Sequence, residues 1–238
     1  MLRAQSDMRA ALVFLMAAGA LLAQETPLTR LKREAIRTQT QPLDKLDPEP
    51  LHRALREWLE WRLPQFEDSV TQITHIEASL SRELKEAAIL DSQDEDDPWK
   101  IKAGYVDFSL RQLPELPHTL FVIASVTVPC GVDEAVYMYH YTPSGRTRVL
   151  ENYRDGYFGP HIVLSELDSE GRRLLLIHYT QCGSSWMGMT YSVYRLSTST
   201  ATADSLLSSA QLLARQRRPG VCPPTRGTDD RVSGSQRG

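Results

Sequence analysis

Residues 172–196 read RRLLLIHYTQCGSSWMGMTYSVYRL, and this stretch decides the fold of the chain. The residues on both sides of the CGSSW segment divide into two alternating faces, with the period of two that indicates β-strands. Small residues in CGSSW are typical of a turn, so the stretch predicts a hairpin with a loop longer than two residues. The first arm is apolar on both faces, which predicts a strand covered on both sides. The second arm carries Thr190 and Ser192 on one face and is expected to be partly covered.

Further strand-like segments precede this hairpin. Prolines, glycines and acidic residues mark turns between them, and the gaps are too short for crossover helices, so we expect antiparallel pairing. The predicted strands cover residues 103–109, 120–128, 134–141, 147–153, 161–167, 172–181 and 187–196.

Two helical patterns come before the strands. Apolar residues recur with helical spacing in two successive segments, the first of which follows prolines that suit a first helical turn. Each pattern has one apolar stripe, which must be buried against the sheet. The predicted fold class is therefore α+β, with two N-terminal helices (about 50–63 and 66–90) packed on an antiparallel β-sheet of about six or seven strands (103–196).

The N-terminus has the pattern of a cleaved signal peptide. Arg3 and Arg9 precede an apolar run at residues 10–23, which is too short for an ordinary membrane span. Cleavage after Ala20 or after Ala23 fits this pattern, as does a start at Met1 or at Met8. We expect an exported protein, secreted or periplasmic, with no membrane span after signal removal. Arginine far outnumbers lysine, which we associate with GC-rich bacterial genomes.

The remaining chain is expected to form one domain with flanking segments. The polar residues after the signal have no sustained period, and the Ser/Thr-, Pro- and Gly-rich C-terminus is typical of disorder, apart from a possible short helix at 204–216. The predicted organisation is a signal peptide at 1–23, a linker at 24–43, a single α+β domain at 44–198 (helical pair 48–90, sheet part 101–198) and a mostly disordered tail at 199–238.

The charge of the chain argues against one class of partner. The full sequence has a net charge of −3, and removal of two basic residues and one acidic residue with the signal leaves −4. Nucleic-acid binding needs a basic face, so no nucleic-acid partner is expected. A cell-envelope glycan or a protein is the kind of partner that we expect, and no cofactor or metal is predicted.

Three cysteines are present: Cys130, Cys182 and Cys222. An oxidising destination makes a disulfide expected, and Cys130 and Cys182 are the predicted pair because both end strand-like runs. Cys222 lies in the Pro/Gly/Arg-rich tail. On the chain-entropy model, the closed loop would stabilise the fold by about 4 kcal/mol.

Several short motifs imitate functional sites. CGSSW at 182–186 resembles the papain-family stretch Cys-Gly-Ser-Cys-Trp, with Ser185 where that family has its nucleophile. That family needs a helix start and a downstream histidine, and no histidine follows His178. A phosphate-loop-like spacing from Gly183 lacks the lysine, and the acidic run at 91–98 lacks the alternation of a calcium loop. None of these motifs predicts a site.

Histidines and carboxylates in the strands allow two further hypotheses. A zinc site would need His140 and His178 to converge with Asp133 or Glu134, but no ligand spacing enforces this. His118 and His161 stand at strand starts. The simpler interpretation of each is a strand histidine that is bonded to a neighbour. Catalytic residues are therefore not assigned.

The tyrosines suggest a binding surface. Tyr137, Tyr139 and Tyr141 alternate on one strand face, and Tyr179, with Tyr191 or Tyr194, could extend the row. Such a row either forms an amphipathic platform for sugars or peptides, or packs beneath Trp58 and the helices, which is the commoner role of such stripes. The candidate binding residues are Tyr137, Tyr139, Tyr141, Tyr179, His178 and Trp186.

One longer pattern resembles a group of uncharacterised secreted bacterial proteins. It consists of PCGxDExxYxY from Pro129, then CxSxW from Cys182, then YxVxR from Tyr191. The resemblance covers about residues 58–196 and extends to the helix region around Trp58 and Pro64. It implies export and a shared fold, and it carries over no site residues because no function is attached to those proteins.

The sequence therefore predicts an exported bacterial binding or structural module without catalytic activity. The alternative is a secreted hydrolase acting on cell-envelope polymers. It would use His178, Asp133 or Glu134, placed at or near strand ends.

Overall fold

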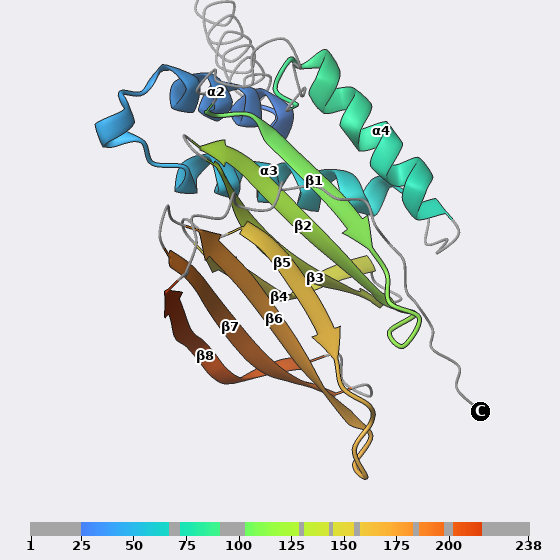
Figure 1. Cartoon of the computed structure of the whole chain (residues 1–238). Coiled ribbons are helices and arrows are strands. Elements are labelled where there is room, and N and C mark those ends of the chain that lie inside the picture. The colour runs from blue at the N-terminus through green and yellow to red at the C-terminus, as the bar shows by residue number, and fades with distance from the viewer. Residues whose placement is uncertain are drawn as a thin grey trace, which may run out of the picture.

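The computed structural model has three layers: helices, a first β-sheet and a second β-sheet (Figure 1). It describes residues 25–66, 72–90, 103–128, 131–142, 145–154, 158–182, 186–197 and 202–215. The helices are α2 (Pro27–Thr40), α3 (Glu49–Arg62) and α4 (Ile73–Glu86), with 3-10 turns at Leu43–Lys45 and Leu63–Gln65. The strands are β1 (Val106–Arg111), β2 (Thr119–Val128), β3 (Gly131–Thr142), β4 (Gly145–Arg154), β5 (Phe158–Leu164), β6 (Arg172–Cys182), β7 (Trp186–Ser197) and β8 (Thr202–Arg215).

The strands form two antiparallel sheets of four, in the orders β1-β2-β3-β4 and β5-β6-β7-β8. The α+β class and the antiparallel pairing are confirmed. The prediction of one sheet with six or seven strands is wrong, because β5 pairs with β6 rather than with β4. Stacking the second sheet on the first buries apolar residues of both, which one extended sheet with an uncovered face would leave in water.

The layers enclose two hydrophobic cores. The helix–sheet core joins the helices to one face of the first sheet, with Leu31, Leu55, Trp58, Leu80 and Val122 among its members. The inter-sheet core joins the opposite face to the second sheet and contains Leu116, Phe121, Ile123, Val136, Met138, Leu150, Leu175, Ile177, Tyr179 and Leu196.

The strand buried on both faces is β2, not the predicted strand at 172–181. Val122 and Ala124 of β2 lie in the helix–sheet core, while Phe121 and Ile123 lie in the inter-sheet core. In β6 only the face with Leu175 and its alternate neighbours is buried, and Leu174 on the other face is 45% exposed. No described element covers that outer face, so the prediction of double coverage for this strand is wrong.

The segment predicted to be a linker, 24–43, instead contains helix α2. Thr26 caps its N-terminus, since the Thr26 hydroxyl oxygen accepts a hydrogen bond from the Thr29 amide at 3.2 Å, and Pro27 occupies the first turn. Only Leu31, Ala35 and Thr38 are buried. This stripe is narrow, but its spacing of four and three residues puts all three side chains on the face that packs against α3.

Gly104 fixes α2 against the start of the first sheet. Its φ is +77°, a conformation that glycine adopts without strain, and a Cβ there would lie 2.7 Å from the Ala35 carbonyl oxygen. The Gln39 side chain donates a hydrogen bond to the Gly104 carbonyl at 3.3 Å. The helix backbone therefore approaches a position that only glycine fits.

The second predicted helix, 66–90, is shorter than expected. Phe66 is extended, with a ψ of 136°, and α4 runs from Ile73 to Glu86. Residues 67–71 lie outside the described part of the chain. Helix α4 holds the edge of the first sheet, because the Glu77 carboxylate accepts a hydrogen bond from the Leu110 amide of β1 at 3.0 Å.

The predicted short helix at 204–216 is a strand. Residues 202–215 form β8, which pairs with β7 over its whole length. Residues 202–215 of the predicted disordered tail are therefore ordered, and residues 199–201 and 216–238 lie outside the described chain, as do the signal segment and the acidic connector.

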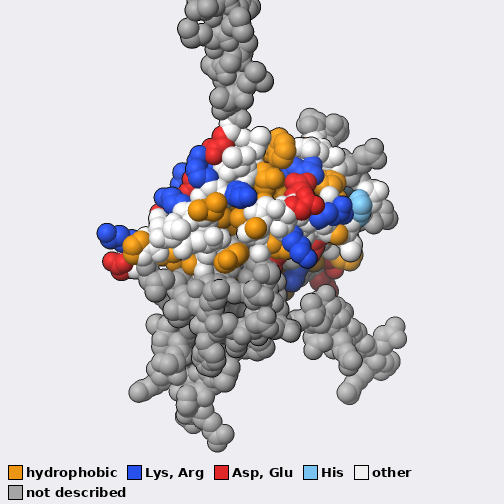
Figure 2. All heavy atoms as spheres, turned by 90° about the horizontal axis from the view of Figure 1, so that it is seen from above, with side chains coloured by type: hydrophobic (Ala, Val, Ile, Leu, Met, Phe, Trp, Pro, Cys, Tyr) orange, Lys and Arg blue, Asp and Glu red, His pale blue; other side chains and the backbone are white. Residues whose placement is uncertain are grey.

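Charged residues join the helix layer to β4. Arg56 and Glu60 of α3 pair with Glu151 (2.6 Å) and Arg148 (3.0 Å), and those two pair with each other at 3.1 Å. On the helix-covered side, cationic and anionic side chains are interspersed (Figure 2). The visible surface on that side therefore has no patch of one sign.

Candidate functional site

The predicted tyrosine row lies inside the molecule. Tyr137 and Tyr139 are 1% and 2% exposed and belong to the helix–sheet core, with their rings 6.5 Å apart. Tyr141 packs at the margin of the same core, with the Arg146 guanidinium 4.4 Å from its ring centre. The tyrosines thus occupy the packing position beneath α3 and Trp58, and they offer no exposed platform.

Tyr179 does not extend that row. It lies in the inter-sheet core on β6, fully buried, and its hydroxyl donates a hydrogen bond to the Asn152 carbonyl at 2.8 Å. This bond links the second sheet to β4 of the first.

The two carboxylates named for the hydrolase alternative face opposite sides of β3. Asp133 is 1% exposed, and the Tyr153 hydroxyl, on the helix side, lies 3.5 Å from it. Glu134 faces the second sheet, where Ser125 and the Gly159 amide donate hydrogen bonds to it. Burial raises the pKa of Glu134, and these two donors oppose that rise. Asp133 thus contacts a neighbouring strand of its own sheet, whereas Glu134 links the two sheets.

His178 lies on a third face. It points to the outer side of the second sheet and stacks on His161, with ring centres 4.7 Å apart and an angle of 15° between rings. Burial, and to a lesser extent the charge of His161, lowers the pKa of His178. The catalytic set His178, Asp133 and Glu134 therefore does not converge.

The remaining sequence hypotheses meet the limits of the described chain. Among the residues that the structure describes, no group of three or more His, Cys, Asp or Glu residues could hold a metal ion. Residues 183–185 and Cys130 fall outside the described part, and the side chains of Cys182 and Trp186 are not described. The predicted disulfide and the role of Trp186 as a binding residue therefore stay predictions.

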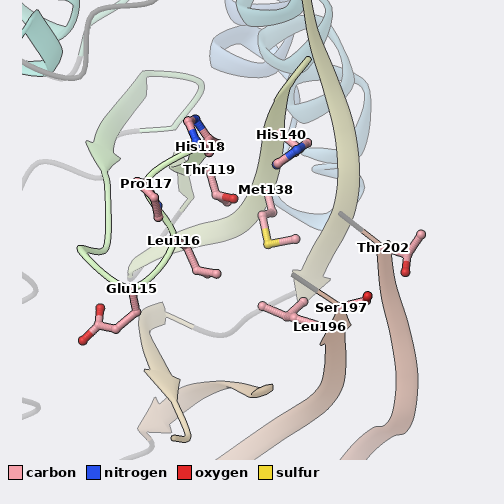
Figure 3. Close-up of a pocket in the computed structure, with 10 residues that line it drawn as sticks. All are labelled: Glu115, Leu116, Pro117, His118, Thr119, Met138, His140, Leu196, Ser197 and Thr202. Carbon is pink, nitrogen blue, oxygen red and sulfur yellow. The ribbon is translucent and has the colours of Figure 1, made fainter. Parts of the chain in front are cut away.

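A pocket of about 230 Å³ opens between the two sheets at one end of the sandwich (Figure 3). We call it the His118/His140 pocket. Its floor consists of Leu116, Met138 and Leu196, three residues of the inter-sheet core that are 9%, 3% and 3% exposed. Its other lining residues are Glu115, Pro117, His118, Thr119, His140, Ser197 and Thr202. The pocket is thus an entrance to the inter-sheet core.

Pairing of neighbouring strands brings the two histidines together. The His118 carbonyl accepts a hydrogen bond from the Tyr141 amide at 2.9 Å, and Thr119 pairs with His140 across β2 and β3. His140 and Met138 stand on the same face of β3, with Tyr139 on the opposite face. The register thereby places Thr119 and His140 on the pocket side of the sheet, and His118, in the turn before β2, lines the same pocket.

The two imidazoles are placed to bind a ligand, and the acidic residue in the described lining does not orient either ring for proton transfer. Partial burial lowers the pKa of His140, and the neighbouring His118 lowers it further. Figure 3 shows the Glu115 carboxylate directed away from both rings. A histidine that acts as a general base is ordinarily oriented by a third group, as in the serine hydrolase triad. Within the described pocket, the polar groups can donate hydrogen bonds to a ligand or accept them from it.

Sequence reasoning missed this pocket. His118 and His140 were recognised in the strand region, but nothing in their spacing pairs them, because the pairing follows from the β2–β3 register. Leu196 and Thr202 come from the second sheet, and their place beside β3 depends on the stacking of two sheets. An alternation pattern carries no information on that stacking.

Comparison of the chain with protein-family models, with curated proteins and with solved structures finds no match. In the described part of the chain, no helix is both long and apolar enough to cross a membrane.

Proposed function

We propose that this chain is an exported, non-catalytic binding module of the bacterial cell envelope, and that the His118/His140 pocket receives the apolar part of a small ligand. The observation that carries the proposal is the floor of the pocket. Leu116, Met138 and Leu196 are core residues, yet the cavity reaches them from the surface.

The lining of the pocket matches the general chemistry of ligand sites. Such sites are concave and mostly apolar, with a few polar groups that fix orientation. Here the polar groups are the two imidazoles, the Glu115 carboxylate and the hydroxyls of Thr119, Ser197 and Thr202. The volume of about 230 Å³ is below the usual range for drug-sized ligands, which favours a short alkyl or small ring group.

Export and the disulfide form part of the same proposal, and one contact supports the disulfide. Glu134, four residues after Cys130, accepts a hydrogen bond from Gly159. Phe158, the residue before Gly159, pairs with Thr180, two residues before Cys182. Glu134 of β3 and Thr180 of β6 are therefore both joined to the start of β5, which supports the proposed pairing.

Intact mass spectrometry of protein exported with its own leader tests export and the disulfide together. We expect a chain that begins at residue 21 or 24 and is two hydrogen masses lighter before reduction than after it. Alkylation of the unreduced chain should modify Cys222 alone, since one disulfide occupies Cys130 and Cys182. A full-length chain would contradict export, and alkylated Cys130 or Cys182 would contradict the pairing.

Blocking the mouth of the pocket tests the binding proposal. Ser197→Trp and, separately, Thr202→Trp should weaken binding of 1-hexanol, a neutral probe, about tenfold or more in saturation-transfer NMR. Loss of contact with about two methylene groups would suffice, because each contributes about 0.8 kcal/mol and tenfold corresponds to about 1.4 kcal/mol.

The matched control is Leu206→Trp, which places the same ring on β8 at a residue that is 44% exposed and does not line the pocket. Its affinity for 1-hexanol should equal that of the wild type. Equal binding by all three variants, or no binding by the wild type, would contradict the proposed site. Circular dichroism of each variant separates blocking from misfolding.

A further inference from the structure

We propose that the His118/His140 pocket selects a small amphiphile with a carboxylate head, such as a short-chain fatty acid. The two imidazoles would bind the carboxylate, and Leu116, Met138 and Leu196 would hold the alkyl chain. This inference rests on the proposed function, since it names the ligand class of the same pocket.

The arrangement of polar and apolar groups gives the ligand its two ends. The apolar floor lies in the inter-sheet core, whereas His118 is exposed and His140 half-buried. Figure 3 shows both imidazoles at one end of the pocket, with Leu196 toward the other end. A ligand that satisfies both ends has a polar head beside the imidazoles and an apolar chain directed inward.

The donor chemistry favours a carboxylate head. Each imidazole can present one N–H when neutral and two when protonated, and a carboxylate has two acceptor oxygens. Hydrogen bonds to an ionised acceptor are shorter and stronger than those between neutral groups. The imidazoles of His118, in the turn before β2, and of His140 on β3 can therefore each donate to one oxygen.

In the described lining of the pocket, no carboxylate is directed toward the imidazoles. Besides the two histidines, Glu115 is the only titratable residue among the described lining residues, and its carboxylate points away from both rings in Figure 3. From β7 and β8 the lining consists of Leu196, Ser197 and Thr202, which carry no charge. A bound carboxylate would place a negative charge beside the two imidazoles, where the described lining itself places none.

Carboxylate binding should therefore be coupled to proton uptake. Burial, together with His118, lowers the pKa of His140 in the free protein, and an anion beside the ring would raise that pKa. By linkage, the affinity for the anion rises as the pH falls, because a protonated His140 binds the anion more tightly than a neutral one. Uptake of one proton gives at most a tenfold gain per pH unit, and the gain stops when the ligand carboxyl itself protonates, at a pH of about 4 to 5.

Titration calorimetry with hexanoate and 1-hexanol tests this inference. With hexanoate we expect binding that tightens about three- to tenfold per unit between pH 7.5 and 5.5, and proton uptake seen as a dependence on the ionisation enthalpy of the buffer. With 1-hexanol, which has the same chain and no charge, affinity should stay constant with pH.

The variant H118Q/H140Q keeps hydrogen-bonding side chains and removes the titration. Its affinities for 1-hexanol and for hexanoate should both be independent of pH between 7.5 and 5.5. Hexanoate binding that is independent of pH in the wild type, or equally pH-dependent in the variant, would overturn the carboxylate assignment and leave the proposed function standing. Failure of both probes to bind would overturn both.

Discussion

Replacing Leu31 by alanine is expected to lower the free energy of unfolding by about 2 to 5 kcal/mol. Leu31 is 0% exposed and joins α2 to the helix–sheet core, so its truncation leaves a cavity that rigid neighbours cannot fill. Urea unfolding followed by circular dichroism measures the change. The result distinguishes a docked helix α2 from a linker, because a leucine in a linker would contribute almost nothing to the free energy of unfolding.

The matched control for Leu31 is Ile36→Ala. Ile36 lies on the same helix and is 49% exposed, so the expected loss is below about 1 kcal/mol. A Leu31→Ala variant as stable as Ile36→Ala would mean that α2 does not dock on the domain in solution.

Acidification from pH 7 to pH 4.5 is expected to remove about 3 kcal/mol of stability through His52 alone. His52 is 4% exposed on α3, and burial lowers its pKa to about 3, whereas in the unfolded chain the group titrates near 6.5. Its folded-state pKa is the lower one, so the unfolded chain takes up the proton first. This contribution is therefore fully present above pH 6.5 and is lost progressively as the pH falls toward 3.

Comparison with two variants isolates the His52 effect. His52→Leu removes the titrating group from the core and should flatten the loss of stability between pH 6.5 and 4.5. His75→Leu, at an exposed position on α4, should retain the loss seen in the wild type. An unchanged pH profile in His52→Leu would show that His52 is accessible to protons in the folded state.

The strand pattern was predictable because alternation records which side chains share a face. All seven predicted strands overlap β1 to β7, and the short connections correctly indicated antiparallel pairing. The predicted strand at 120–128 is β2, which is buried on both faces, whereas double coverage was predicted for 172–181. The local sequence pattern was sufficient to predict a strand wherever burial depends only on residues that are close in the sequence.

Three features depended on contacts that the local pattern does not record. Helix α2 has few inward apolar residues, and the ion pair between Arg30 and Glu57 at 2.7 Å adds a contact to α3. Strand β8 has leucines at 206, 207, 212 and 213, whose spacing also fits a helix, and pairing with β7 decided the outcome. The division into two sheets depends on where β5 finds its partner.

The candidate site was predictable only in its residue types. The tyrosine stripe was correctly placed on one strand face, and packing beneath α3 was the weighed alternative that the structure shows. His140 was considered as a metal ligand with His178, yet the two lie in different layers of the molecule. Its actual neighbour, His118, is brought near by strand register.

Methyl-resolved NMR with 1-hexanol at pH 7 tests the central claim most directly, because it locates the probe residue by residue. We expect shift changes at the methyl groups of Leu116, Met138 and Leu196. We expect none at Leu174, which is 45% exposed on the outer face of the second sheet. Changes centred on Leu174, or no change at the three floor residues, would contradict the assignment of the His118/His140 pocket as the binding site.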